Sequence, residues 1–106
     1  MTVPGGKVGG SMYAIAFDLD LETLKLTYHN DSFNNAYNDI ARFLQTKGFD
    51  RVQGSVYFGN DKVDAVKTVM AVNQLSKQFS WFGSSVRDIR MLRIEENNDL
   101  RPAIEL

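Results

Sequence analysis

The sequence predicts an α+β sandwich in which two helices cover one face of a mixed sheet. Segments 12–20, 51–58 and 86–94 are short and rich in β-branched and aromatic residues, as buried strands are. Segments 33–47 and 62–79 repeat apolar residues at three- and four-residue spacing, as amphipathic helices do. The 106 residues contain no internal repeat, which predicts a single domain.

The composition excludes several classes of protein and favours an ordinary globular domain. Hydrophobic residues make up 43% and charged residues 24% of the chain, which are ordinary values for a globular domain. The chain has no cysteine, which excludes disulfides, thiolate catalysis and cysteine-based metal sites. No apolar run approaches the ~20 residues that span a bilayer, so we expect a cytoplasmic protein. Because the net charge is −1, any contact with nucleic acid must depend on a local basic patch or be weak.

Residues 1–11 have the composition of a flexible leader, either disordered or added for expression. They contain four of the eight glycines and one of the two prolines. We therefore expect Met12 to be the natural start and residues 12–106 to form the folded domain.

The strand at 12–20 ends in carboxylates and is the expected centre of the fold. Its side chains alternate between a bulky face and a small face, namely Tyr13, Ile15 and Phe17 against Ala14, Ala16 and Asp18. An acid at the end of a strand is either a solvated residue or a catalytic group held on a rigid element.

The next two segments are an expected short strand and the first helix. Leu24, Leu26 and Tyr28 alternate with polar residues, which predicts a strand or extended arm over 23–28. Ser32 is an expected N-cap for the helix over 33–47, and Gly48 is expected to end it in a left-handed conformation.

The segment 51–58 is predicted to be one strand with a polar face, formed by Gln53, Ser55 and Tyr57. That face is either solvated, a dimer interface or a floor for substrate. The helix over 62–79, capped by Asn60 and Asp61, carries an apolar arc wider than one sheet face requires. We therefore expect it to pack on two sides, as in an oligomer.

The last segments combine aromatic and basic residues. Trp81 and Phe82 lie in an expected turn over 80–85, where they either close one end of the core or stack on bases. The strand over 86–94 carries three arginines that either grip phosphates or pair with nearby acids, namely Arg87, Arg90 and Arg93 with Asp88, Glu95 and Glu96.

Few sets of catalytic residues are available. There is no glycine-rich phosphate loop between a strand and a helix, and His29 is the only histidine. Asp18 and Asp20 share one side of their strand, about 6–7 Å apart by the strand rise. Such a pair could hold a magnesium ion, although two carboxylates alone are a weak signal.

Four short motifs together identify a family. They are Met12-Tyr-Ala-Ile-Ala-Phe-Asp18, Asn35-Ala-Tyr37, Gln53-Gly-Ser-Val-Tyr57 and Ser85-Val-Arg-Asp-Ile-Arg90. This pattern resembles virulence-associated protein D, VapD, from Met12 almost to the C-terminus. The resemblance implies a modified ferredoxin-like fold, a homodimer, and kinship with the small CRISPR adaptation nucleases.

The resemblance also implies a function. VapD proteins are similar to toxins of toxin–antitoxin pairs and act as endoribonucleases on messenger RNA, so a small antitoxin protein is an expected partner. The family's catalytic Asp falls on Asp18. One departure concerns the fold, because no hairpin is visible between the 51–58 strand and the second helix, and the 23–28 strand is expected to substitute for it.

In a ribonuclease, Asp18 would accept the proton of the attacking ribose 2′-hydroxyl or position a magnesium ion. Ser55, Tyr57, Arg87 and Arg90 are the candidates to hold the phosphate of single-stranded RNA. The alternative is a non-catalytic dimeric scaffold that binds nucleic acid or protein, in which Asp18 is structural.

Overall fold

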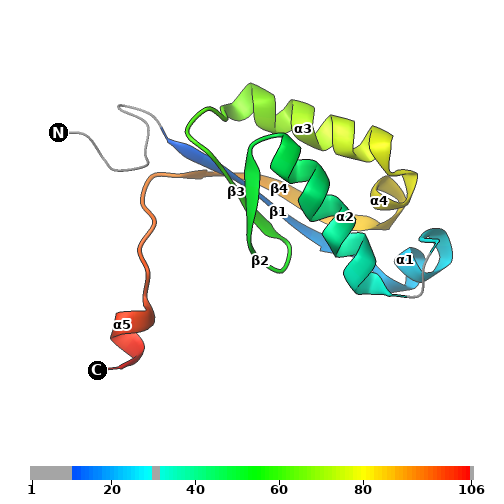
Figure 1. Ribbon diagram of the computed structural model, residues 1–106, viewed down its shortest axis with the longest axis horizontal. Coiled ribbons are helices and arrows are strands. Elements are labelled where there is room, and N and C mark those ends of the chain that lie inside the picture. The colour runs from blue at the N-terminus through cyan, green and yellow to red at the C-terminus, as the bar shows by residue number, and fades with distance from the viewer. Residues whose placement is uncertain (1–10, 30–31, 106) are drawn as a thin grey trace.

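A computed structural model describes residues 11–29 and 32–105 (Figure 1). The leader predicted at 1–11 lies outside these residues except for Ser11. Ser11 is buried, accepts a hydrogen bond from Arg93 Nε at 2.8 Å and donates one to Glu95 Oε1 at 3.1 Å.

The predicted α+β class is confirmed, and the sheet is antiparallel throughout. Its strands are β1 (Met12–Leu19), β2 (Phe49–Gln53), β3 (Val56–Gly59) and β4 (Val86–Ile94), in the spatial order β2-β3-β1-β4. Each neighbouring pair is antiparallel, so the prediction of a mixed sheet is wrong. The reason is an additional chain reversal between β2 and β3, which makes the strand beside β1 run against it.

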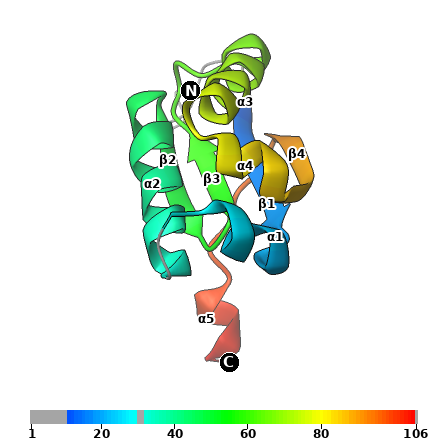
Figure 2. The same ribbon diagram turned by 90° about the vertical axis from the view of Figure 1, so that its right-hand side faces the viewer.

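The two long helices lie on one face of this sheet, as predicted (Figures 1 and 2). They are α2 (Phe33–Thr46) and α3 (Ala65–Gln78). Three short helices complete the described part of the chain: α1 (Leu21–Thr27), α4 (Ser80–Ser85) and α5 (Arg101–Ile104). The last of these follows an extended segment that leads away from the sheet (Figure 1). Among the described residues, no helix is long and apolar enough to cross a membrane.

The strand predicted over 23–28 is wrong, because this segment forms α1. Asp20 caps the helix, with Oδ1 accepting from the Glu22 backbone N–H at 3.1 Å and Oδ2 from Thr23 Oγ1 at 3.0 Å. Leu24 and Tyr28 are buried and lie four residues apart on one helical face. Leu26 is 87% exposed. The apparent alternation therefore reflects one exposed leucine rather than a strand.

The single strand predicted over 51–58 is also wrong. It is the hairpin of β2 and β3, which supplies the strand that the ferredoxin-like pattern requires. Gly54 adopts a φ of 39° at the turn, a left-handed conformation that favours glycine, and its carbonyl accepts from Arg51 Nε at 2.9 Å. Gly48 also has a positive φ, of 92°, and it ends α2 as predicted.

The core fills the space between the sheet and the helices. Phe17 on β1 stacks on Tyr57 of β3 and Tyr37 of α2, with ring centroids 6.0 and 6.5 Å apart. Trp81 and Phe82 of α4 are buried, so the prediction that they close one end of the core is confirmed. Further buried residues come from α2 and α3: Ala36, Ile40, Leu44, Ala71 and Leu75.

Helix α3 begins later than predicted and leaves part of its apolar surface uncovered. Its N-cap is Asp64, whose Oδ1 accepts from the Lys67 backbone N–H at 2.8 Å, rather than Asn60 or Asp61. Ala71 of this helix is buried. Val66, Val69 and Met70 stay exposed, as expected for a helix with more apolar surface than the sheet covers.

Candidate functional site

The sheet face opposite α2 and α3 carries a narrow apolar floor that ends in charged residues. We call it the open face. Residues directly opposite each other on neighbouring strands point to the same side of a sheet. Three rows follow from the register: Phe58, Ala14 and Leu92; Val56, Ala16 and Arg90; and then Asp18 with Asp88. Small alanines thus run down the middle, between larger side chains, to a pair of carboxylates.

Asp18 lies at this charged end and contacts an arginine. Its Oδ2 accepts a hydrogen bond from Arg87 Nη2 at 2.9 Å, and the two side chains are 59% and 62% exposed. Asp88, directly opposite on β4, accepts from Arg90 Nε at 3.0 Å through Oδ1 and at 3.1 Å through Oδ2. Two like charges placed opposite each other in a sheet repel. The two arginines offset this repulsion.

A register shift in the β1–β4 pairing allows Arg87 to reach Asp18. Asp18 pairs with Asp88, but the next residue, Leu19, pairs with Val86, so Arg87 has no partner across the ladder. Such a bulge turns a side chain away from the strict alternation of a strand. Arg87 is therefore available to the same end of the sheet as Asp18, although alternation along β4 would place it on the helix side.

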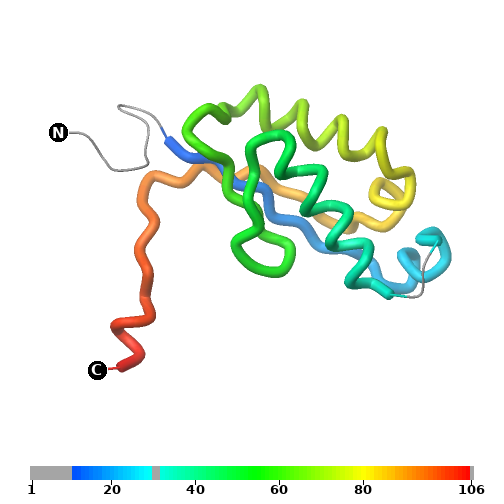
Figure 3. The backbone as a smooth tube through the Cα atoms, viewed as in Figure 1, coloured from blue at the N-terminus to red at the C-terminus, as the bar shows by residue number. Residues whose placement is uncertain are grey.

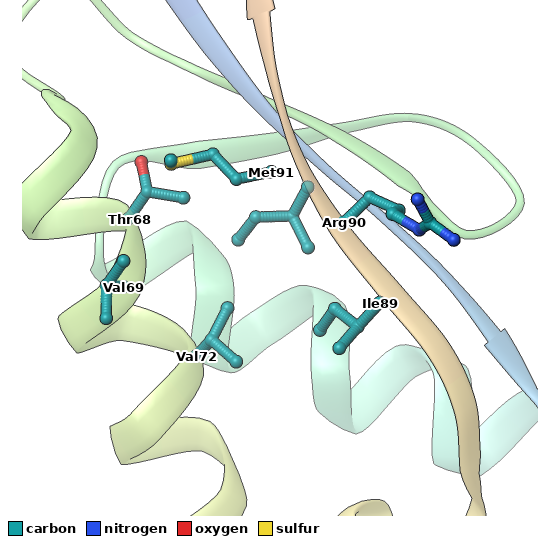
Figure 4. A pocket seen from close by; sticks show the side chains of 7 residues that line it. Thr68, Val69, Val72, Ile89, Arg90 and Met91 are labelled. Atoms are coloured by element: carbon teal, nitrogen blue, oxygen red, sulfur yellow. The ribbon is translucent and has the colours of Figure 1, made fainter.

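Arg90 also points to the open face. On the other side of β4, a groove of about 170 Å³ separates β4 from α3. Its lining consists mainly of Thr68, Val69 and Val72 from α3 with Ile89 and Met91 from β4. Figure 4 shows Ile89 and Met91 directed into this groove, while the Arg90 guanidinium extends to the opposite side of the strand.

The β2–β3 turn brings Ser55 to the same end of the sheet. The backbone N–H of Phe17, the residue before Asp18, donates to the Ser55 carbonyl at 3.1 Å. Ser55 is partly buried at the edge of the floor. Asp18, Arg87 and Arg90 are thus brought together at one end of the open face. Ser55 borders this end through its backbone carbonyl, but the alternation that turns Val56 to the open face turns Ser55 to the other side.

Sequence similarity to known proteins identifies the family of the chain. The family model described as CRISPR associated protein Cas2 matches residues 11–101. Endoribonuclease VapD 2 of Riemerella anatipestifer is 50% identical over 93 residues, which cover 88% of this chain and 99% of the relative. The chain belongs to the VapD family of endoribonucleases. The family and the class of enzyme predicted from the sequence are both confirmed.

Two further VapD relatives match at nearly full length. The Endoribonuclease VapD homolog of Helicobacter pylori is 47% identical over 95 residues, covering 90% of this chain and 98% of the relative. Endoribonuclease VapD of Haemophilus influenzae is 44% identical over 88 residues, covering 83% of this chain and 92% of the relative. The match to the Cas2 model agrees with the predicted kinship to CRISPR proteins.

Tyr57 does not belong to the site of this VapD chain, so its prediction as an RNA contact is wrong. It lies opposite Ile15 on the helix-covered side of the sheet and is fully buried. Burial raises the pKa of Tyr57, and its hydroxyl has no hydrogen-bond partner among the described residues. The sequence analysis placed Tyr57 on a polar, uncovered face of its strand, whereas the apolar Val56 and Phe58 face the open side and Tyr57 meets the helices.

Asp88 is the residue at the site that sequence reasoning considered only as an ion-pair partner. It pairs with Arg90, as one of the two interpretations of the arginines expected, and Arg93 Nε similarly contacts Glu95 Oε1 at 3.1 Å. The position of Asp88 opposite Asp18 could not be predicted from the sequence. That position depends on the β1–β4 register.

The donors at Asp18 do not make a complete magnesium site within one VapD chain. Magnesium takes six oxygen ligands in octahedral geometry, commonly one or two carboxylates with water and phosphate. Asp20, considered beside Asp18 as a carboxylate that could hold the ion, uses both oxygens to cap α1. The carboxylates of Asp18 and Asp88 are each occupied by an arginine. Among the described residues, no three acidic or histidine side chains gather.

Proposed function

We propose that this chain cleaves single-stranded RNA at the charged end of the open face, with Asp18 as the key carboxylate. The observation that supports this most is the convergence of Asp18 with Arg87 and Arg90. These residues combine a proton acceptor with donors for phosphate oxygens on strands of a rigid sheet. The nuclease class follows from the family, and the assignment to this site is the proposal.

The arginines are available to RNA because their present ion pairs are exposed. The side chains of Arg87 and Arg90 are 62% and 70% exposed, and their acidic partners at least half exposed. Ion pairs of this kind contribute only about 0–1 kcal/mol. A phosphate group offers each guanidinium a bidentate acceptor in place of the carboxylate. Binding of RNA through Arg87 would therefore release Asp18 for chemistry.

The released carboxylate would act as a general base. Asp18 would accept the proton of the ribose 2′-hydroxyl while that oxygen attacks the adjacent phosphorus. The bond from phosphorus to the 5′-oxygen would break, leaving a 2′,3′-cyclic phosphate, and the 5′-oxygen would take a proton from water. Arg87 and Arg90 would stabilise the charge that develops on the phosphate. The phosphate contact predicted for Ser55 would require the β2–β3 turn to present its hydroxyl to the open face.

Single-stranded RNA suits this mechanism, because a flexible strand can bring its 2′-hydroxyl in line with the bond that breaks. The charged end also presents few groups for reading bases, which favours contact with the backbone. Since the net charge of the chain is −1, we expect modest affinity that decreases with salt.

The open face also supports a homodimer. An uncovered face of an antiparallel sheet is usually polar. Here it carries Val56, Phe58 and Leu92 around two alanines, and Leu92 is 46% exposed. A second copy placed on this floor would bury it and set two Asp18 sites near one another. The exposed α3 residues described above would stay outside such a contact.

The assay for the site uses a 5′-labelled single-stranded RNA and an isosteric substitution. We expect Asp18→Asn to lower the cleavage rate 10²- to 10⁴-fold, the range for loss of a general base. Asp50→Asn is the matched control, because Asp50 is an exposed carboxylate on the same face, opposite Phe58. Cleavage at the wild-type rate by Asp18→Asn would refute the assignment. RNA binding without cleavage by the wild-type chain would favour the scaffold alternative.

The magnesium ion at Asp18 stays a prediction, and the same assay tests it. The mechanism above requires no metal, so we expect cleavage to persist in EDTA. Loss of cleavage in EDTA, restored by added magnesium, would instead show that the ion joins the RNA at Asp18.

The dimer is tested by measuring mass in solution. We expect Leu92→Asp to shift the wild-type dimer towards monomer, because it places a charge in the apolar floor. Leu26→Asp, on a leucine that is 87% exposed on α1, should leave the dimer intact. A wild-type chain that is monomeric at micromolar concentration would contradict this part of the proposal.

The toxin role, the small antitoxin partner and the cytoplasmic location rest on the family resemblance alone. They predict that expression of the wild-type chain arrests growth of a bacterial host and that Asp18→Asn does not. Growth arrest by both chains would show that toxicity does not depend on Asp18.

A further inference from the structure

Helices α2 and α3 enclose a valley on the side of the molecule away from the open face. Its polar lining is lysine and glutamine, and Phe43, Met70 and Ala71 form the apolar part. Two adjoining hollows, of about 180 and 320 Å³, share Lys47 and Gln74. Lys67 lines the first hollow, and Lys77 with Gln78 lines the second. Figures 1 and 2 show α2 and α3 side by side on the same side of the sheet. We call these hollows together the α2–α3 valley.

The lysines of the valley have no acidic partners in the described part of the chain. Lys67 Nζ donates to the Lys62 carbonyl at 3.0 Å, and Lys47 Nζ lies 5.5 Å from the centre of the Phe43 ring. Ion pairs in the described residues all involve arginine. No acidic residue lines either hollow. The positive charge of the valley is therefore not neutralised within the chain.

The distribution of charge along the sequence strengthens this contrast. The chain has 13 acidic and 12 basic residues, yet segments 40–49 and 65–87 contain no aspartate or glutamate. These segments include the second half of α2 and all of α3 and α4. A chain with a net charge of −1 thus keeps a one-sided basic surface over two helices. Such separation indicates an anionic ligand.

We infer that the α2–α3 valley binds the phosphate backbone of RNA at a distance from the cleaved bond. This inference rests on the proposed function and adds a second binding surface to it. Lys67 and Lys77 are ten residues apart on one helix, about 15 Å by the helical rise, which suits an extended strand. The glutamines offer amide donors to phosphate and sugar oxygens. A long RNA would contact the valley and the open face together, whereas a short one would reach only the open face.

The test measures how RNA binding depends on salt. The probe is a 20-nucleotide strand with 2′-O-methyl riboses, which lacks the attacking hydroxyl of the proposed mechanism. Binding is measured in EDTA, so that metal-bound water cannot cleave the strand either. Each phosphate neutralised on a single strand contributes about 0.7 to the slope of log affinity against log salt. We expect Lys47→Gln with Lys77→Gln to reduce this slope by about 1.4. The control pair, Lys25→Gln with Lys62→Gln, changes the net charge equally and should leave the slope unchanged.

A second pair of variants adds charge instead of removing it. Gln74→Glu places a carboxylate at the centre of the valley, and Gln45→Glu adds one to α2 outside its lining. We expect weaker binding of the 20-nucleotide strand only for Gln74→Glu. Equal effects of the valley and control variants would overturn the inference. The inference would also be overturned if the valley variants bound RNA as the wild type does but lost binding to vesicles of anionic lipid.

Cleavage assays distinguish a failure of this inference from a failure of the proposed active site. The valley variants should raise KM for a 20-nucleotide RNA several-fold and leave cleavage of a hexanucleotide unchanged. If Asp18→Asn still cleaves RNA while the valley variants lower the salt slope, the proposed active site fails and the valley stands. If valley variants lose cleavage of both RNAs while circular dichroism shows native folding, the valley is not a remote surface.

Discussion

Two tyrosines with opposite hydrogen-bonding states allow the packing of the core to be tested by one kind of substitution. Tyr28 OH donates to Asp39 Oδ2 at 2.8 Å. The hydroxyl of Tyr57 is buried and has no hydrogen-bond partner among the described residues. Tyr→Phe removes only the hydroxyl in each case. We therefore expect the two substitutions to change the free energy of unfolding with opposite signs.

The magnitudes follow from the state of each hydroxyl. Removing the Tyr28 hydroxyl deletes a bond to a carboxylate that keeps its second partner, Arg42, so the free energy of unfolding should decrease by about 1–2 kcal/mol. The Tyr57 hydroxyl lost its hydrogen bonds to water on folding and gained none in return, so removing it removes the cost of burying an unpaired polar group. We expect Tyr57→Phe to increase the free energy of unfolding by up to about 2 kcal/mol.

Urea denaturation of both variants at one protein concentration measures these changes, because any dimer makes stability depend on concentration. For a domain of this size, 1 kcal/mol corresponds to about 4–8 °C in Tm. A decrease of more than about 1 kcal/mol for Tyr57→Phe would refute the reasoning, since it would require a partner for that hydroxyl. Cleavage of RNA should be unaffected by Tyr57→Phe, because this side chain lies in the core.

The remaining predictions concern pH and two local structures. Burial, and then the hydrogen bond to Asp39, raises the pKa of Tyr28 to about 12. The unfolded tyrosine ionises near pH 10, so the protonated Tyr28 hydroxyl should stabilise the fold fully below pH 10 and lose this effect as the pH rises to 12. In urea titrations at increasing pH, Tyr28→Phe should flatten this decline in the free energy of unfolding. Asp20→Ala should lower the free energy of unfolding by about 1 kcal/mol through loss of the α1 cap, while Asp20→Asn should retain both stability and cleavage. Gly48→Ala should destabilise by about 1–2 kcal/mol in thermal unfolding, because φ is 92° and the new Cβ would lie 3.1 Å from Asn60 and Val63; an unchanged Tm would contradict this.

The sequence was sufficient for the long elements and insufficient for the short ones. The helix at 33–47 and the strand at 86–94 each show one periodicity over many residues, which local reasoning resolves well. In the segment 23–28, a two-residue alternation arose from Leu26, whose side chain is exposed rather than part of the core. The deciding feature was instead Asp20, a residue that local reasoning considered as a metal ligand and that acts as a helix cap.

The site was predictable only where it depends on position within one strand. Asp18 at the end of β1 follows from alternation, but its neighbours depend on pairing between strands that are about 70 residues apart. Arg87 reaches Asp18 because of a register shift that no local pattern indicates. Tyr57 is excluded for the related reason that the hairpin at Gly54 determines which face of β3 meets the helices.

The alternation of side chains along β3 links the catalytic proposal to the dimer. Because Tyr57 occupies the covered side of β3, its neighbours Val56 and Phe58 must lie on the open side, next to Ala16 and Ala14. An apolar floor and a pair of carboxylates therefore share one surface. A second copy that buried the floor would also draw solvent away from Asp18 and Asp88, where electrostatic interactions with a phosphate strengthen as water is excluded. If this coupling holds, Leu92→Asp should lower cleavage even though Leu92 lies two rows from Asp18 along the sheet.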